Sequence, residues 1–456
     1  MVKNHQLDLT EGPILTKLLV FSVPIILSGI LQLLFNAADI IVVGQFAGDN
    51  ALGAVGSTSS LIHLMINLFV GLATGTNVVA ANFFGSKNKK ALHTTVHTAM
   101  LLSLLSGIFM TVIGIFFAKE ILKLMKAPNG VLEQATLYLQ IYFGGITATM
   151  VYNFGSALLR AKGDTQRPLY ILFLAGIINV ILNLLFVVKF KMGVAGVGIA
   201  TVISQIVSAV LIVVILCRDD GEFKLSLREL SIDRTILYKI IRIGVPAGFQ
   251  GMMFSFSNVI IQTSINSFDS AKIIAGSSAS SNIENFVYTS MNGFAQGTLT
   301  FVSQNFGAGK FSRIKKTAWI SEGIVFIIGL ILGYTAIFFS SELLPLYSHT
   351  PDTLSAGKER LVIICSTYFL CGIMDVIGNI IRGIGYSVLP MIVSMAGACG
   401  FRILWLMTIF QFARFHKPSM IYITYPLSWI LTFIVELICF IHIFKKISRT
   451  EISSIS

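Results

Sequence analysis

The sequence contains two copies of one glycine-rich pattern, GLATGTNVVAANFFG at 71–85 and GFAQGTLTFVSQNFG at 293–307. The copies start 222 positions apart, and residues on either side of them obey the same offset. The related pairs include Val23 and Val245, Pro24 and Pro246, Arg160 and Arg382, Gly163 and Gly385, and Pro168 and Pro390. A constant offset over this length of chain indicates an internal duplication.

The composition indicates a membrane protein. The chain has 456 residues, of which 55% are hydrophobic and 12% charged, whereas soluble domains average about 25% charged residues. This balance excludes soluble, disordered and collagen-like classes. The five cysteines have neither the spacing of a zinc site nor that of a disulfide framework.

Apolar runs define the fold that we predict. A helix that crosses a bilayer needs about 20 apolar residues, and the sequence contains twelve such runs, six on each side of a polar segment. We therefore predict an all-α polytopic membrane protein with twelve transmembrane helices. The two six-helix bundles would be related by a pseudo-two-fold axis along the membrane normal, because six crossings return the chain to its starting side. The expected spans are 14–44, 52–84, 94–117, 132–160, 168–190, 194–217, 236–266, 273–306, 317–340, 356–383, 387–411 and 419–444.

The polar segment RDDGEFKLSLRELSIDR divides the two halves. We predict an N-lobe at 1–217, a cytoplasmic linker at 218–234 and a C-lobe at 235–456. With the N-terminus inside the cell, 22 of the 33 lysines and arginines fall on the cytoplasmic side, which predicts that both termini are cytoplasmic. The net charge of +12 therefore reflects the orientation of the chain in the membrane. We do not expect nucleic acid as a partner. Parallel repeats of this kind place a substrate path between two bundles.

Polar residues within the predicted spans of the N-lobe suggest a cation site. An ionised Asp at the bilayer centre costs about 2.5–3.5 kcal/mol, so Asp39 needs a neutralising partner or a hydrated position at the outer interface. Asn179 and Asn183 are one helical turn apart and share a helix face, and Thr201 lies on the next span. Their oxygens are ligands that hard cations prefer. The alternative for the asparagines is interhelical hydrogen bonding.

The C-lobe contains a second polar set within its spans. Its members are Glu284, Asp375, Arg402 and Glu436. These groups could neutralise one another as a structural network, or they could form an acidic patch that attracts a cationic compound or a second proton.

Two prolines and three histidines remain to be assigned. Pro24 and Pro246 lie inside the first and seventh spans, where each removes a backbone donor and kinks its helix. Each kink could be a hinge that moves during transport or a fixed bend in the helix. We expect His63, His97 and His442 to be packing residues that lack a partner at the spacing of metal ligands.

Five motifs stand out in the two halves: FNAADIIVVGQFAGDNALGAVG at 35–56, GLATGTNVVAANFFG at 71–85, GFAQGTLTFVSQNFGAG at 293–309, LLRAKGDTQRP at 158–168 and IIRGIGYSVLP at 380–390. In their order, spacing and duplication, these motifs resemble the multidrug and toxic compound extrusion (MATE) family over residues 10–445.

The resemblance implies a two-lobed exporter in the cell membrane that exchanges Na⁺ or H⁺ for bulky, often cationic, amphipathic compounds. It also implies that Asp39, Asn179, Asn183 and Thr201 form the cation site. Asn183 stands where a proton-coupled branch has Asp, which favours Na⁺. Another branch carries an essential Glu on the seventh helix, and residues 249–257 contain no acid.

The partners that we expect are the lipid bilayer and drug-like small molecules, and we expect a monomer. The sequence has neither a P-loop for ATP nor an HExxH motif, so we expect no enzyme and no cofactor beyond the coupling ion. The alternative is a flippase for lipid-linked saccharides or lipids from the same superfamily. Such flippases tend to have extra spans and several cavity arginines, whereas this chain has twelve predicted spans and a single deep arginine, Arg402.

Overall fold

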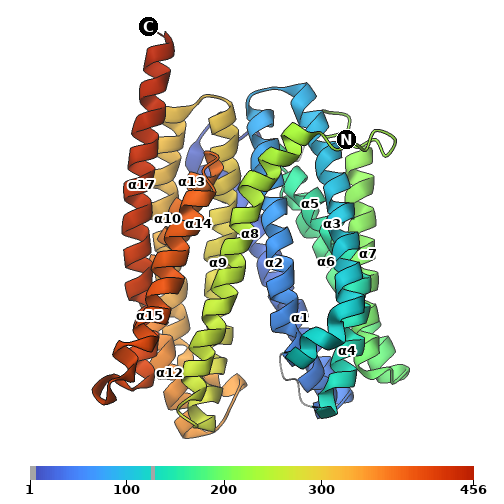
Figure 1. Cartoon of the computed structure of the whole chain (residues 1–456), viewed down its shortest axis with the longest axis vertical. Coiled ribbons are helices and arrows are strands. Elements are labelled where there is room, and N and C mark those ends of the chain that lie inside the picture. The colour runs from blue at the N-terminus through green and yellow to red at the C-terminus, as the bar shows by residue number, and fades with distance from the viewer. Residues whose placement is uncertain (1–6, 125–128, 456) are drawn as a thin grey trace. The chain divides into compact units, whose positions relative to one another are not determined.

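The structure, a computed structural model, describes residues 7–124 and 129–455, and its regular elements are all helical in these ranges (Figure 1). The first half contains α1 (Ile14–Phe46), α2 (Asp49–Gly85), α3 (Lys89–Leu124), α4 (Asn129–Gly144), α5 (Ile146–Lys162), α6 (Gln166–Asn183), the π-helix η1 (Leu184–Lys189) and α7 (Gly193–Cys217). The second half contains α8 (Arg234–Asn266), α9 (Ala271–Gly307), α10 (Phe311–Phe338), α11 (Ser340–Leu343), η2 (Leu344–Leu346), α12 (Pro351–Cys365), α13 (Phe369–Gly383), α14 (Val388–Ser394), the π-helix η3 (Met395–Gly400), α15 (Phe401–Met407), η4 (Ile409–Gln411), η5 (Ala413–Phe415), α16 (Pro418–Tyr422) and α17 (Thr424–Ile455).

Each predicted span coincides with one helix or with a short series of consecutive helical segments. By length and apolar composition alone, eight helices in the described ranges qualify as membrane spans, or nine if α12 and α13, bent by 45°, count as one. Three predicted spans fail this stricter test. One is divided between the short helices α4 and α5, and the other two, in α8 and α9, contain many polar residues. The predicted class, an all-helical membrane protein, is confirmed.

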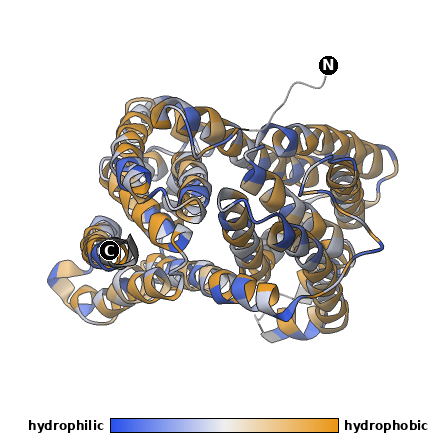
Figure 2. Cartoon of the chain, turned by 90° about the horizontal axis from the view of Figure 1, so that it is seen from above, coloured by the Kyte–Doolittle hydropathy of each residue, from blue (hydrophilic) through white to orange (hydrophobic). Residues whose placement is uncertain are grey.

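The surface of the helices fits a lipid environment. Hydrophobic residues prevail along most of the helical ribbon (Figure 2). Phe116, Trp319 and Phe338 each expose more than two thirds of their area (72%, 72% and 79%). Side chains of this size find favourable contacts in lipid tails, whereas water would penalise their exposure.

The chain divides into two compact units whose boundaries fall inside helices. Unit 1 comprises Met1–Leu9 and Leu27–Gly248, and unit 2 comprises Thr10–Ile26 and Phe249–Ser456. Helix α1 therefore contributes its first part to unit 2, and α8 contributes its first part to unit 1. In both helices the boundary between the units lies two residues after a proline, which is Pro24 in α1 and Pro246 in α8.

Within unit 1, glycines let α2 and the first part of α8 approach backbone to backbone. A Cβ atom added to Gly71 would lie 2.2 Å from the backbone nitrogen of Gly248, and one added to Gly75 would lie 2.5 Å from the carbonyl oxygen of Ile240. Real side chains do not tolerate such distances. Small residues at helix crossings are a main source of helix association in membranes, so the first copy of the glycine pattern is a packing motif.

The second copy has the corresponding role within unit 2. A Cβ atom on Gly293 would lie 2.9 Å from the Cα atom of Ile26, and one on Gly297 would lie 2.1 Å from the hydroxyl oxygen of Ser22. Helix α9 thus packs against the first part of α1. The duplicated pattern therefore holds the first part of α1 in one unit and the first part of α8 in the other.

We predict that Gly71→Ala lowers the free energy of unfolding by about 1–3 kcal/mol, because the new methyl group overpacks the crossing with α8. The matched control is Gly323→Ala in α10, where an added Cβ would meet no atom within 4 Å. Both changes give the same gain in helix propensity, so the difference in melting temperature of the purified proteins reports packing. Equal melting temperatures would contradict the proposed crossing.

Candidate cation site and buried acids

The four residues predicted for the cation site lie together within unit 1. Asp39 is on α1, Asn179 and Asn183 are on α6, and Thr201 is on α7. Both asparagine side chains are buried, with exposures of 5% and 0%.

A chain of side-chain hydrogen bonds joins these four residues. The amide nitrogen of Asn183 donates to the Asp39 carboxylate and, at 3.2 Å, to the amide oxygen of Asn179. The amide nitrogen of Asn179 donates in turn to the Thr201 hydroxyl at 3.4 Å. Asp39 is therefore paired rather than isolated, and the asparagines bond both across helices and to each other.

Local sequence explains why Asp39 meets α6. Phe35 and Asp39 are one turn apart on α1, so their side chains share a face. A Cβ atom on Gly176 would lie 1.8 Å from the Phe35 ring, which means that the ring occupies the space where α6 lacks a side chain. Asn183 is the last residue of α6 before the π-helix η1, and π-helical turns often occur at functional sites.

One polar atom at this site has no partner. The amide oxygen of Asn183 is buried and accepts no hydrogen bond, a condition that costs about 1–3 kcal/mol. Its side chain also contacts the carboxylate of Asp39, so an oxygen acceptor and a negative charge are available together. Tyr138 and Tyr142 of α4 lie within electrostatic range of Asp39. A hard cation or a proton could satisfy this set.

In unit 2, Glu284 has a partner that the sequence analysis did not identify. Arg360 of α12 holds it in a two-point ion pair, with nitrogen–oxygen distances of 2.9 and 2.8 Å. Both side chains are nearly buried, at 6% and 5% exposure. Arg360 lies in the charged stretch PDTLSAGKERL, at the start of the predicted span 356–383, and was not included among the polar residues of the C-lobe spans. The ion pair favours a structural role for Glu284.

Arg402 of α15 and Arg360 both lie over the ring of Tyr425, with Arg360 at 5.9 Å from its centroid. The Arg402 guanidinium stacks on the Tyr425 ring at 4.2 Å and donates to the Ser428 hydroxyl at 2.9 Å. A cation over an aromatic face is stabilised by the ring quadrupole.

Glu436 connects instead to Arg382 through a series of polar side chains. Ser394 donates to Glu436 at 3.0 Å, and Gln250 donates to Ser394 at 3.1 Å. Arg382 then donates to Gln250 at 2.7 Å and to Asn379 at 3.0 Å. This network joins α8, α13, α14 and α17 within unit 2.

Several acid oxygens near these helices are buried without a hydrogen-bond partner. They are one oxygen of Asp375, one of Glu436 and both of Glu322. Glu322 lies on α10 and was missed, although a single acid in the apolar run ISEGIVFII signalled it. Buried carboxyl groups without partners are costly when ionised, so these acids form a second candidate site for a proton or a cationic compound.

Duplicated helical units with polar groups enclosed in their spans define the class of polytopic membrane transporters. The family model MatE matches residues 24–185 and again 246–407, and the two matches have the offset of 222 residues that the sequence repeat has. The chain therefore belongs to the MATE family of transporters, which are not enzymes.

Relatives of known description agree with this assignment. The chain is 28% identical to the probable multidrug resistance protein YoeA of Bacillus subtilis, over 83% of each chain. It is 24% identical to the probable multidrug resistance protein NorM of Thermotoga maritima, over 86% of this chain and 85% of that one. A multidrug resistance MATE transporter in an outward-facing conformation matches 97% of this chain and 98% of its own, with a TM-score of 0.89 and 21% identity.

We predict that Arg360→Met destabilises the protein by about 3–5 kcal/mol, because it leaves the Glu284 charge buried and unpaired. The double variant Arg360→Met with Glu284→Met removes both charges and should recover part of the loss. Melting temperatures of the wild type, both single variants and the double variant test this cycle. A double variant as unstable as the sum of the single variants would show that the two side chains do not interact.

Proposed function

We propose that this transporter exports amphipathic, often cationic, compounds from the cell in exchange for Na⁺ or H⁺. The observation that carries the proposal is the pairing of Asp39 with Asn183 beside an unpartnered amide oxygen. The substrate class is supported by relatives described as multidrug resistance proteins. Arg402 is the one deep arginine expected from the sequence, but Arg360 and Arg382 are buried as well, so the arginine count does not argue against a flippase. The relatives described as multidrug resistance proteins favour the exporter.

The coupling ion would bind where oxygens surround a single carboxylate. Asp39 supplies the negative charge, and the amide oxygens of Asn179 and Asn183 with the Thr201 hydroxyl supply neutral ligands. A carboxylate in a low-dielectric bundle is stable when a proton or a metal ion neutralises it. Because three of the four ligands cannot take up a proton at neutral pH, the set favours Na⁺, and H⁺ on Asp39 is the alternative.

Helix α1 offers a route from the cation site to unit 2. Asp39 lies in the part of α1 that belongs to unit 1, and the part before Leu27 belongs to unit 2. A ligand that binds one conformation better shifts the equilibrium by its difference in affinity. A change at Asp39 would therefore be transmitted along α1, with Pro24 as a hinge in that helix and Pro246 as its counterpart in α8.

The membrane orientation is part of this proposal. We propose a monomer in the cell membrane with both termini and the linker 218–234 in the cytoplasm, between an N-lobe at 1–217 and a C-lobe at 235–456. The distribution of lysine and arginine supports it.

We expect Asp39→Asn to abolish gradient-driven efflux, because it keeps the shape of the side chain and removes the charge that attracts the ion. Inverted vesicles with a Na⁺ gradient and a pH gradient imposed separately measure this. The control is Asp269→Asn, at the loop between α8 and α9, which should transport normally. Normal transport by Asp39→Asn in both gradients would refute the site, and Glu436→Gln and Asp375→Asn would then test the unit 2 acids.

We expect Asn183→Asp to weaken the dependence of efflux on Na⁺ and to strengthen its dependence on pH. The new carboxylate lies against Asp39, and two adjacent carboxylates favour sharing a proton. The same vesicles, assayed at several pH values with and without Na⁺, provide the measurement. An unchanged ratio of Na⁺-driven to pH-driven transport would contradict the role of Asn183.

A further inference from the structure

The linker between the two sequence halves follows a defined path along α3. The backbone N–H of Asp233 donates to the Thr98 hydroxyl at 3.1 Å, and that hydroxyl donates to the carbonyl oxygen of Ser231 at 3.2 Å. The Phe223 side chain is fully buried. These contacts hold the linker against unit 1, so linker side chains have fixed neighbours on α3.

An ion pair at the start of α3 adds to this attachment. The Lys89 ammonium lies 2.9 Å from the Glu222 carboxylate, and its hydrogen bond lowers the pKa of Glu222. Both groups are partly exposed, so the pair contributes little to stability.

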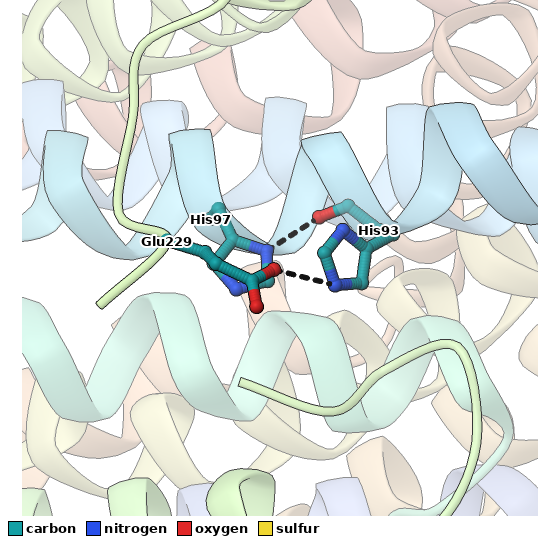
Figure 3. A group of neighbouring side chains, drawn as sticks. All are labelled: His93, His97 and Glu229. Carbon is teal, nitrogen blue, oxygen red and sulfur yellow. Dashed lines mark hydrogen bonds and ion pairs between the residues drawn. The ribbon is translucent and has the colours of Figure 1, made fainter. Parts of the chain in front are cut away.

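The linker brings Glu229 to two histidines of α3 (Figure 3). His93 and His97 are one helical turn apart, and their rings lie 4.3 Å apart between centroids. One ligand atom from each of the three residues lies within 4.8 Å of the others, and the His93 ring nitrogen Nε2 lies 3.4 Å from a Glu229 oxygen. The expectation that His97 is a packing residue overlooked His93, four residues earlier in the sequence.

Hydrogen bonds around His97 prepare one of its nitrogens for a metal. Nδ1 donates to the carbonyl oxygen of His93 at 2.8 Å, which leaves the lone pair on Nε2. Metal-binding histidines are typically oriented by such a bond from the other ring nitrogen. In the structure Nε2 accepts a hydrogen bond from the backbone N–H of Ser226 at 3.1 Å. A metal at Nε2 would replace this hydrogen bond.

We propose that His93, His97 and Glu229 form a binding site for a divalent transition metal, with Zn²⁺ as the best fit. Two imidazole nitrogens and one carboxylate oxygen are ligands of open zinc sites, in which water fills the fourth position. Tetrahedral ligands at zinc distances lie about 3.4 Å apart, which is the spacing of His93 and Glu229. These two side chains are 45% and 59% exposed, so water and metal can reach the site.

The site would have a consequence for the linker. A metal bound by α3 and by Glu229 would join the linker to the helix by coordination, in place of the hydrogen bond that the Ser226 backbone N–H donates to His97. Metal supply would then change how firmly the linker is held, independently of the ion that binds at Asp39.

Zinc titration of the tag-free, full-length protein in detergent, after treatment with a chelator, tests the site. A chromophoric chelator as competitor measures affinity and stoichiometry. We expect one site per chain and an affinity at least about tenfold lower in His93→Gln and in Glu229→Gln, because even residues behind the ligands cost 10–100-fold. Glu222→Gln is the matched control from the same linker and should bind as the wild type does. Equal affinity in all four proteins would overturn the proposal.

A second measurement follows the linker itself. Trypsin can cleave after Lys224 and Arg228, which flank Ser226 within the linker. We expect Zn²⁺ to slow cleavage after Arg228 in the wild type and in Glu222→Gln, and to have no effect in His93→Gln. His93 is half exposed, so its replacement leaves the fold intact. Cleavage that Zn²⁺ slows equally in His93→Gln would show that the metal acts elsewhere.

Discussion

Two backbone-to-backbone crossings organise this molecule. Gly71 and Gly75 allow the first part of α8 to pack closely against α2 in unit 1. Gly293 and Gly297 allow the first part of α1 to pack closely against α9 in unit 2. Lipid tails are as apolar as the side chains, so association within the bilayer depends on close packing rather than on the hydrophobic effect. The duplicated glycine pattern therefore determines which parts of α1 and α8 each unit contains.

One of the two helices that belong to both units also contains the acid of the candidate cation site. Asp39 lies on α1, within unit 1, and the same helix continues from a part that belongs to unit 2. A buried charge needs a partner in a medium of low dielectric constant, and two buried acids meet this need differently. Asp39 in unit 1 accepts a hydrogen bond from the neutral amide of Asn183, whereas Glu284 in unit 2 pairs with Arg360. The first arrangement leaves the charge available to a cation, and the second neutralises it.

The buried acids of unit 2 show the limit of classifying residues by type. Arg402 was grouped with three acids, but its guanidinium stacks on Tyr425. Arg360 and Arg382 are the arginines that hydrogen-bond into the acidic networks. Composition and periodicity identify charged residues within spans, but the choice among three arginines depends on helix rotation and on which faces meet. The Glu229 cluster depends in the same way on the path of a linker that has no regular periodicity.

The sequence alone determined the helical membrane class and the duplication, because these follow from apolar run length and a constant offset. The rarity of polar groups in spans pointed to the residues of the candidate cation site, and the resemblance to the MATE family joined them into one hypothesis. Asn179 and Asn183 were predictable as a pair because helical periodicity places them on one face. Only the tertiary structure decided that Phe35 fills the space beside Gly176, that α1 and α8 each contribute to both units, and that Glu229 meets His93. These are contacts between residues far apart in the chain, and their geometry depends on the packing of whole helices, which no local pattern encodes.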